Sequence, residues 1–282
     1  MPATYTPIRY PGGKTKLYPL VKSIIDENDM AGCVYCEAFA GGAGLAMKLL
    51  LKGDVSSIVI NDLDRAVYCM WDAIVNHSDE MCEFVKSAPL CISEWERHRE
   101  RYKNPSGASD LELAKSAFYL NRTNVSGILE GGVIGGINQD GPYKMDARFN
   151  RDGLVNKIRE ISQRAADISI HNLDAEDFIE SALPQGRVKV LIYLDPPYVK
   201  KGPGLYKSSF DEDKHRSLAK KIKRSKRKWI VTYDSDPLID EIYKTRVAGE
   251  MEIGYSAYSA SIGHEKLILS PNLSIPDNAL SA

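Results

Sequence analysis

One short segment limits the fold of this chain more than any other. An apolar run, Leu191 to Leu194, continues directly into Asp195, Pro196, Pro197 and Tyr198. Such a run predicts a buried strand, and because successive prolines cannot continue a central strand, the chain must leave the sheet at its carboxyl edge. Open α/β sheets place their ligands at that edge. The segment therefore predicts a functional edge with a carboxylate and an aromatic ring; the alternative, a plain Asp-Pro turn, requires neither the strand nor the tyrosine.

A glycine-rich turn follows an earlier predicted strand, Val34 to Phe39. The turn contains Gly41, Gly42 and Gly44, after which apolar residues recur at helical spacing. Glycines at this place let the backbone approach a ligand closely and direct the helix N–H groups at it. Nicotinamide-binding proteins use the same device, so the turn alone leaves the cofactor open.

Asp62 ends a second predicted strand, Ser57 to Asn61, and its carboxylate can accept hydrogen bonds from a ribose diol. The alternative for Asp62 is a helix N-cap. Two strand-helix units, the first with a glycine turn and the second with an acidic residue after its strand, predict a parallel sheet. Further strand signals lie at Ile168 to His171, Val188 to Leu194, Trp229 to Tyr233 and Lys266 to Leu269.

Between the second and third predicted strands the pattern becomes helical, and the loop Asn121 to Gly141 is rich in Gly and Asn. We therefore expect a seven-stranded, mainly parallel α/β sheet of the Rossmann-like kind. Residues 1–75 and 166–282 would form one discontinuous cofactor-binding domain, and residues 76–165 an inserted, mostly helical domain, for which the family resemblance given below implies target recognition. The residues from Pro271 onward are expected to form a loose tail.

Composition adds only a few constraints. The formal net charge of −1 does not indicate a nucleic-acid-binding chain, and the basic run 220–228 either touches phosphates or forms the solvated face of a helix. Cys33 and Cys36 lack the second pair that a zinc site needs, so we expect them buried and reduced, with no metal. No apolar run approaches the ~20 residues of a membrane span, and a signal-peptide pattern is absent at the N-terminus, so a cytoplasmic location is expected.

The order of these motifs resembles that of the Dam-like, D12 class adenine-N6 DNA methyltransferases. The resemblance is carried by Arg9 to Lys14, Glu37 to Gly44, Asn61-Asp62 and Asp195 to Tyr198. It implies a class I methyltransferase fold, S-adenosylmethionine as cofactor and duplex DNA with a flipped adenine as substrate. Enzymes of this kind belong to restriction-modification systems or to phages, and we expect a monomer.

The resemblance also implies roles for individual residues. The catalytic motif would be Asp195, Pro196, Pro197 and Tyr198. The expected cofactor-binding residues are Tyr10, Gly13, Lys14, Glu37, Phe39, Gly41, Gly44, Asp62, Asp177, Phe178 and Asp195, with Asp177 and Phe178 beside the adenine ring of the cofactor. The expected DNA contacts are Asn121, Arg122, Ser126, Tyr143, Lys200 and Lys201.

The chemistry accounts for the residue types. An adenine N6 amine is a poor nucleophile because its lone pair is delocalised into the ring. If the Asp195 carboxylate and the Pro196 carbonyl both accept hydrogen bonds from the amine, its lone pair can face the methyl donor. Tyr198 would stack on the base, which must be extruded because its amine is unreachable inside a duplex.

One loop departs from the GATC-methylating branch of that family, in which an aromatic residue invades the helix and an arginine reads a base. Val125 stands where the aromatic residue would be, and Glu130 where the arginine would be. We therefore expect methylation outside GATC or with little sequence context. The alternatives are an N4-cytosine or RNA adenine methyltransferase, a catalytically silent nucleic-acid-binding scaffold, and a nicotinamide-dependent oxidoreductase, which has no use for Asp195 to Tyr198.

Overall fold

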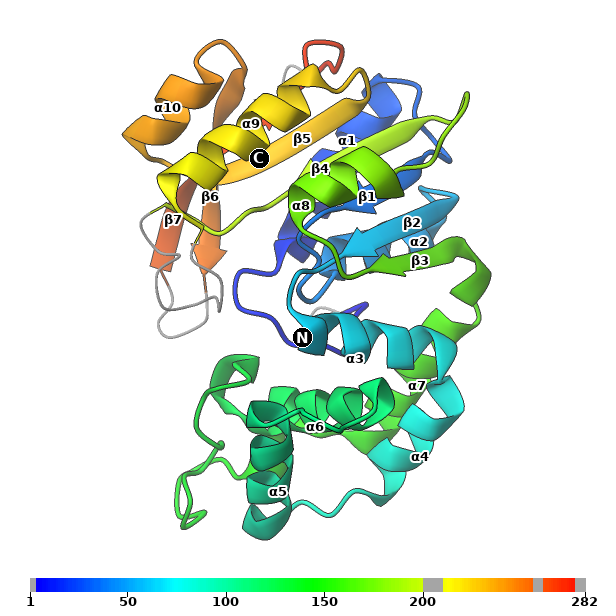
Figure 1. The fold of residues 1–282 in the computed structure, drawn as a ribbon, viewed down its shortest axis with the longest axis vertical. Helices are drawn as coiled ribbons and strands as arrows, with labels where there is room; N and C mark the ends of the chain where they lie inside the picture. Colours follow the sequence, from blue (N-terminus) through cyan, green and yellow to red (C-terminus); the bar gives the residue numbers. More distant parts are fainter. Residues whose placement is uncertain (1–3, 200–209, 256–260, 277–282) are drawn as a thin grey trace.

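The computed structural model describes residues 4–199, 210–255 and 261–276. Within these ranges seven strands form one sheet in the order β3-β2-β1-β4-β5-β7-β6 (Figure 1). Strands β1 to β5 pair in parallel, whereas β7 is antiparallel to both of its neighbours. The mainly parallel seven-stranded sheet is thus confirmed. The strands are β1 Val34–Glu37, β2 Ser57–Asn61, β3 Ile168–His171, β4 Val190–Leu194, β5 Lys228–Asp234, β6 Val247–Tyr255 and β7 Ser261–Leu269.

Helices cover both faces of the sheet, because the central strands are apolar on both sides. Tyr35 and Leu191 pack with the helices of one face, whereas Cys36 and Ile192 pack with those of the other. The alternation follows from the two-residue period of a strand. The first face carries η1 Lys14–Leu17, α1 Tyr18–Glu27, α2 Gly44–Lys52 and α3 Arg65–Asn76; the second carries α8 Ala175–Asp177, η5 Phe178–Ala182, α9 Glu212–Arg224 and α10 Pro237–Tyr243.

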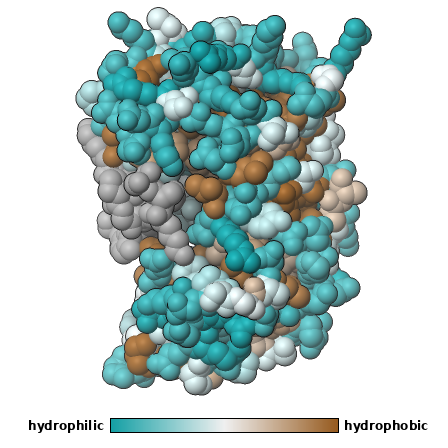
Figure 2. Space-filling view, in the orientation of Figure 1, coloured by the Kyte–Doolittle hydropathy of each residue, from teal (hydrophilic) through white to brown (hydrophobic). Residues whose placement is uncertain are grey.

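A helical lobe lies between α3 and β3 in the sequence and below the sheet in Figure 1. Helices α3 and α6 pack against each other, and the apolar core of the lobe is continuous with that of the sheet face beside α3. Figure 2 shows that hydrophobic residues gather in a middle band of this side, between two largely hydrophilic ends. The lobe consists of α4 Ser78–Ser87, α5 Ile92–Lys103, α6 Asp110–Thr123, η2 Val125–Gly127, η3 Met145–Arg148, α7 Arg151–Ser162 and η4 Ala165–Asp167.

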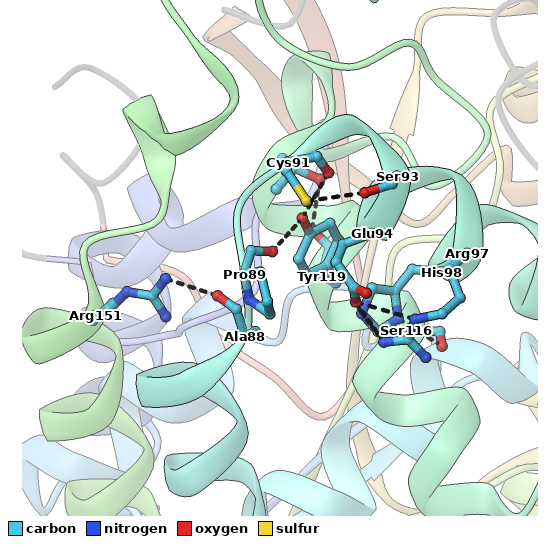
Figure 3. Close-up of polar contacts among 11 residues, drawn as sticks. Ala88, Pro89, Cys91, Ser93, Glu94, Arg97, His98, Ser116, Tyr119 and Arg151 are labelled. Atoms are coloured by element: carbon cyan, nitrogen blue, oxygen red, sulfur yellow. Dashed lines mark hydrogen bonds and ion pairs between the residues drawn. The ribbon is translucent and has the colours of Figure 1, made fainter.

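Buried polar contacts tie the helices of the lobe together (Figure 3). The hydroxyl of Tyr119, on α6, donates to the carbonyl of Pro89 at 2.8 Å, which anchors the turn between α4 and α5. His98, on α5, shares a 3.0 Å hydrogen bond with Ser116 and stacks on Tyr119 with ring centroids 4.3 Å apart. Burial lowers the pKa of His98 to about 4, so this imidazole is neutral near pH 7. The lobe therefore has a fixed internal frame.

The structure also bears on the sequence predictions for the cysteines, the C-terminal residues and the strands. Cys33 and Cys36 are buried and free, as expected. The loose tail is wrong for residues 271–276, because Leu273 is buried and the Ser274 amide donates to Asn28 Oδ1 at 2.9 Å. In the part of the chain that the structure describes, every helix is too short or too polar to cross a membrane. Strand β6 corresponds to no strand signal that the sequence analysis located.

Candidate active site

Asp195 directly follows β4, which lies between β1 and β5 in the sheet. Pro196 and Pro197 are buried, and the Asp195 side chain is 18% exposed. One carboxylate oxygen, Oδ1, accepts a 2.9 Å hydrogen bond from the Thr232 hydroxyl on β5, and Oδ2 accepts a 2.6 Å bond from Lys14. Each oxygen has a second lone pair, so Asp195 can still accept a hydrogen bond from a ligand.

Lys14 brings the N-terminal motif to this carboxylate. Its ammonium is buried at the start of η1 and donates to the Gly12 carbonyl at 3.1 Å, to Asp195 at 2.6 Å and to the Tyr198 hydroxyl at 2.8 Å. The amide of Gly13 donates to the Tyr10 carbonyl at 3.3 Å and closes the turn before the lysine. Two predicted motifs that are distant in sequence therefore meet in one buried network.

Two further carboxylates lie near this network. Glu265, on β7, is buried, receives the Tyr198 hydroxyl and lies 3.5 Å from the Lys14 ammonium. Glu37, at the end of β1, is 4% exposed, and burial together with the charge of Asp195 holds its pKa well above the usual range. Burial and Glu265 also raise the pKa of Asp195, against the lowering effect of Lys14. The residues around Asp195 thus include more acidic than basic groups.

The Glu37 carboxyl tests the fit of the expected cofactor. Its Oε2 atom is buried and lacks a hydrogen-bond partner among the described residues. A buried polar atom without a partner costs free energy unless a ligand satisfies it. S-adenosylmethionine carries a sulfonium and an ammonium group, so a cluster of acidic groups with an unsatisfied carboxyl oxygen fits a ligand with these cations.

The glycine turn fits the N-terminal motif tightly, which the sequence did not reveal. A β-carbon on Gly41 would lie 2.7 Å from the Tyr10 ring, and one on Gly44 would lie 2.2 Å from the Thr15 hydroxyl oxygen. Real β-carbons essentially never approach other atoms so closely. Gly41 therefore packs directly against the Tyr10 ring, which a side chain at this position would displace, whereas at Gly44 only the rotatable Thr15 hydroxyl would have to move.

Asp62 joins the end of β2 to the glycine turn. Its carboxylate accepts hydrogen bonds from the Gly41 amide at 2.8 Å and from the Asp64 amide at 2.9 Å. The N-cap of α3 is Asp64, which accepts from the Ala66 amide, so the capping alternative does not apply to Asp62. Burial raises the pKa of Asp62 to about 6. The carboxylate therefore ties the end of β2 to the glycine turn, and its role as a ribose acceptor stays a prediction.

The predicted aromatic residues around the cofactor have different environments. Phe39 is partly buried and meets Phe210 edge-on, with ring centroids 5.9 Å apart. Phe178 is fully buried and meets His171 edge-on, with ring centroids 5.9 Å apart, and its place beside the adenine of the cofactor stays a prediction. Asp177, the residue before it, is exposed.

Two predicted DNA contacts have internal partners instead. The side chain of Asn121 is 1% exposed and bonds the backbone of Arg9 and the Gly127 carbonyl, so its polar atoms are engaged inside the protein and its DNA contact stays a prediction. Its amide holds the N-terminal motif against α6. Arg122 is partly buried and donates to the carbonyls of Pro7 and Arg148. Both side chains therefore support the junction between the sheet and the lobe.

The remaining predicted DNA contacts belong to the loop after α6 or lie outside the described residues. Ser126 is partly buried with a positive φ of 55° in η2, and Tyr143 is 71% exposed. Val125, at the position discussed for the missing aromatic residue, is 47% exposed. Lys200 and Lys201 lie outside the described residues.

Sequence reasoning missed Thr232 and Glu265 as members of the site. Thr232 is fully buried in β5, and Glu265 faces the same network from β7, where it is the register partner of Asp234. An acidic residue at the start of the predicted apolar strand 266–269 was the available signal for Glu265. Its partners could not be inferred, because they depend on the antiparallel pairing of β7 with β5.

Comparisons with known proteins agree with this site. A model of the D12 class N6 adenine-specific DNA methyltransferases matches residues 10–257. The Type II methyltransferase M.CviBI of Paramecium bursaria Chlorella virus NC1A is 23% identical over 261 residues, which cover 92% of this chain and 94% of that protein.

Solved structures resemble the chain more distantly. A putative RNA methyltransferase from Pyrococcus horikoshii has a TM-score of 0.43 at 12% identity, over 96% of this chain and 86% of that one. The rRNA methyltransferase aviRa from Streptomyces viridochromogenes has a TM-score of 0.39 at 11% identity, over 93% and 87% of the two chains.

The fold and the family match together define a Rossmann-like, class I methyltransferase that uses S-adenosylmethionine. The chain belongs to the D12 class N6 adenine-specific DNA methyltransferase family. Its chemistry is therefore methyl transfer to DNA. The expectation of a restriction-modification or phage-derived enzyme agrees with its similarity to a viral methyltransferase.

Proposed function

We propose that this protein transfers a methyl group from S-adenosylmethionine to the N6 amine of adenine in DNA, after the target nucleotide has been extruded from the duplex. The observation that carries the proposal is the buried network at the carboxyl end of β4, in which Lys14 donates to both Asp195 and Tyr198, and Thr232 donates to Asp195. This arrangement places a carboxylate, a proline carbonyl and an aromatic ring at one edge of the sheet.

The cofactor, when bound, supplies an electrophilic methyl group on a positively charged sulfur. Asp195 and the Pro196 carbonyl would accept the two N6–H hydrogen bonds and turn the nitrogen lone pair away from the ring. Tyr198 would stack on the extruded base and offset part of the unstacking cost. The remaining acceleration comes from holding the amine in line with the methyl group.

Residues for cofactor binding line the neighbouring strand ends. Glu37 would accept from the cationic part of S-adenosylmethionine, and Asp62 from the ribose hydroxyls. Tyr10 and Gly41 pack together at the turn between these two acidic residues. The exposed Asp177, beyond β3, would flank the adenine of the cofactor.

Positive charge near the junction of the two parts supports DNA as the substrate. Arg9, Arg122 and Arg148 lie close enough that their like charges, together with burial, lower the pKa of Arg9 and Arg122. Within the described residues no carboxylate pairs with any of these three guanidinium groups. Like charges that lack an acidic partner are stabilised by an anion, and backbone phosphates supply one.

The lobe, residues 76–165, would act as the target-recognition domain. The exposed side chain of Tyr143 is available for contact with DNA, and that of Ser126 is partly accessible. Glu130 offers only acceptors when ionised, so it cannot grip guanine as an arginine does, and Val125 lacks a ring to fill the gap left by a flipped adenine. We therefore propose that methylation is not restricted to GATC.

One assay tests the proposal against its alternatives. The protein is incubated with methyl-labelled S-adenosylmethionine and duplex DNA, single-stranded DNA or RNA, and the products are digested to nucleosides. Labelled N6-methyldeoxyadenosine from DNA is the expected product. N4-methyldeoxycytidine, methylated adenosine from RNA only, or absence of product would replace the proposal with an N4-cytosine enzyme, an RNA enzyme or a silent binding protein, respectively.

A further inference from the structure

The most unusual group in the site that the sequence analysis did not assign is the carboxylate of Glu265. It is 0% exposed on β7, opposite Asp234 in the register with β5. Burial of a carboxylate is costly unless charges and hydrogen bonds compensate it. The compensation here comes from two residues of the proposed catalytic site, since Tyr198 donates to Glu265 and the Lys14 ammonium lies 3.5 Å away.

The positions of the three charges decide what Glu265 can do. Lys14 lies 2.6 Å from Asp195 and 3.5 Å from Glu265, so one ammonium is shared between two carboxylates. A carboxylate that shares its counter-ion keeps more of its negative charge available to another donor. Glu265 also receives the hydroxyl of Tyr198, which limits the directions in which that ring can point.

We propose that Glu265 is a positioning residue for methyl transfer, which shares the positive charge of Lys14 with Asp195 and orients the ring of Tyr198. It acts through these two residues and does not touch the target base. Asp195 then remains a strong acceptor for the N6 amine, and the ring is set for stacking. This inference rests on the proposed function, because it assigns the amine and the base to Asp195 and Tyr198.

The charges around Asp195 give the expected pH behaviour. The ionisable groups that act on it include Lys14 from η1, Tyr35 and Glu37 from β1, Tyr193 from β4, Tyr233 from β5 and Glu265 from β7. Glu265 raises the pKa of Asp195 and Lys14 lowers it. Removing the charge of Glu265 therefore lowers the pKa of Asp195, and its carboxylate persists to lower pH.

The test uses Glu265→Gln, which keeps the size and the acceptor for Tyr198 but removes the charge. Single-turnover methylation of duplex DNA at saturating cofactor should slow by at least about tenfold, because the acceptor and the ring are less well placed. The acidic limb of its pH profile should move to lower pH. Cofactor affinity, measured by calorimetry, should stay within about threefold of the wild type.

A carboxyl ¹³C NMR titration gives a reading that does not depend on activity. Asp195→Asn identifies the resonance of Asp195, which should titrate at lower pH in Glu265→Gln than in the wild type. Glu265→Asp restores a charge and should return the titration toward the wild type, even if the glutamine variant folds poorly. Glu250→Gln, at an exposed position on β6, is the matched control and should change neither reading.

The outcomes separate the two proposals. Wild-type protein that fails to methylate adenine contradicts the proposed function, and the NMR titration then still reports whether Glu265 acts on Asp195. An active wild type with an unchanged rate, pH profile and Asp195 titration in Glu265→Gln would overturn the positioning role. A slower variant whose pH profile and titration are unchanged would also overturn it, since that pattern indicates a purely structural role.

Discussion

The carboxyl edge of the sheet and the loop after α6 hold their functional side chains in different ways. At the sheet edge, Asp195 and Lys14 are largely buried and bound to each other before any ligand arrives. In the loop, Val125 and Tyr143 face solvent, with 47% and 71% of their surface exposed. The internal contacts of the loop are made instead by Asn124, which accepts from Trp95 and donates to two backbone carbonyls of the loop.

This difference separates chemistry from target choice. Charged groups that act on an amine must be placed with an accuracy of about 0.5 Å, and here strands and internal ion pairs fix their positions. Side chains that meet a variable DNA sequence project from a loop, where a substitution leaves the core intact. Substitutions at the edge should therefore alter the rate of transfer, and those in the lobe should alter DNA binding and context.

The largest effect is expected at the catalytic carboxylate. Asp195→Ala should lower the single-turnover rate by more than about 100-fold, because it removes an acceptor that acts on the amine during transfer. Cofactor affinity should remain mostly intact, since Glu37 and Asp62 are unchanged. Rapid-quench kinetics with labelled cofactor, together with calorimetry, measure the two quantities.

A matched carboxylate controls for the change in charge. Asp213, exposed in the first turn of α9, lies outside the site, and Asp213→Ala should leave the rate unchanged. If Asp195→Ala loses tenfold or less, Asp195 cannot be the residue that holds the amine. The carboxyl edge of the sheet would then not be the part of the molecule that controls the rate of methyl transfer.

A smaller effect is expected at the ribose position. Asp62→Ala should weaken S-adenosylmethionine binding by about 1–3 kcal/mol, because a pair of ribose hydroxyls would lack its acceptor. Asp64→Ala, two residues away, removes the cap of α3 and should lower the free energy of unfolding by about 1 kcal/mol with little effect on cofactor affinity. Equal affinity losses in the two variants would assign both residues to the turn alone.

The protonation of Asp62 gives a second test of its role in cofactor binding. Burial raises its pKa to about 6, so the carboxyl gains a proton as the pH falls through that value and loses acceptor capacity. Cofactor affinity should therefore be highest above about pH 6 and should decline below it. Calorimetric titrations across this range should show the decline in the wild type, whereas Asp62→Asn should lack it; an identical decline in both would exclude Asp62 as its source.

The sequence predicted the catalytic edge better than its surroundings, for physical reasons. An apolar strand that ends in Asp195 and two prolines has few possible placements, so β4 and its edge were predictable. The contact of Tyr10 with Gly41 joins distant segments and has no local signal. Strand β6 contains glycine and acidic residues in place of an apolar run, and its pairing with β7 is what makes it a strand.

The lobe shows the limits of motif reasoning. Asn121 and Arg122 were predicted to contact DNA, but a polar side chain in a motif can equally satisfy backbone groups, and only the folded chain distinguishes the two roles. Phe178 is a similar case, because an aromatic residue after a strand can point into the core as well as toward a ligand, and this ring is buried. Their burial depends on packing between distant segments.

The smallest effect is expected for a single phosphate contact. Arg148→Ala, at an exposed position of the junction, should weaken DNA binding several-fold and reduce the slope of log affinity against log salt by about 1. Lys220→Ala, at an exposed position in the basic run of α9, is the matched control and should change neither if that run is only a solvated face. If Lys220→Ala changes the slope of log affinity against log salt and Arg148→Ala does not, the DNA contacts α9 and not the junction.

The most direct test of the account is a map of methylated bases on a plasmid that lacks modification. After incubation with the protein and S-adenosylmethionine, long-read sequencing locates each modified base and its context. The account predicts N6-methyladenine in contexts other than GATC, because the proposed catalytic edge at Asp195 would methylate adenine, while the loop with Val125 and Glu130 lacks the groups expected to read GATC. Methyladenine confined to GATC would contradict the interpretation of the loop, and methylation of cytosine would contradict that of the catalytic edge.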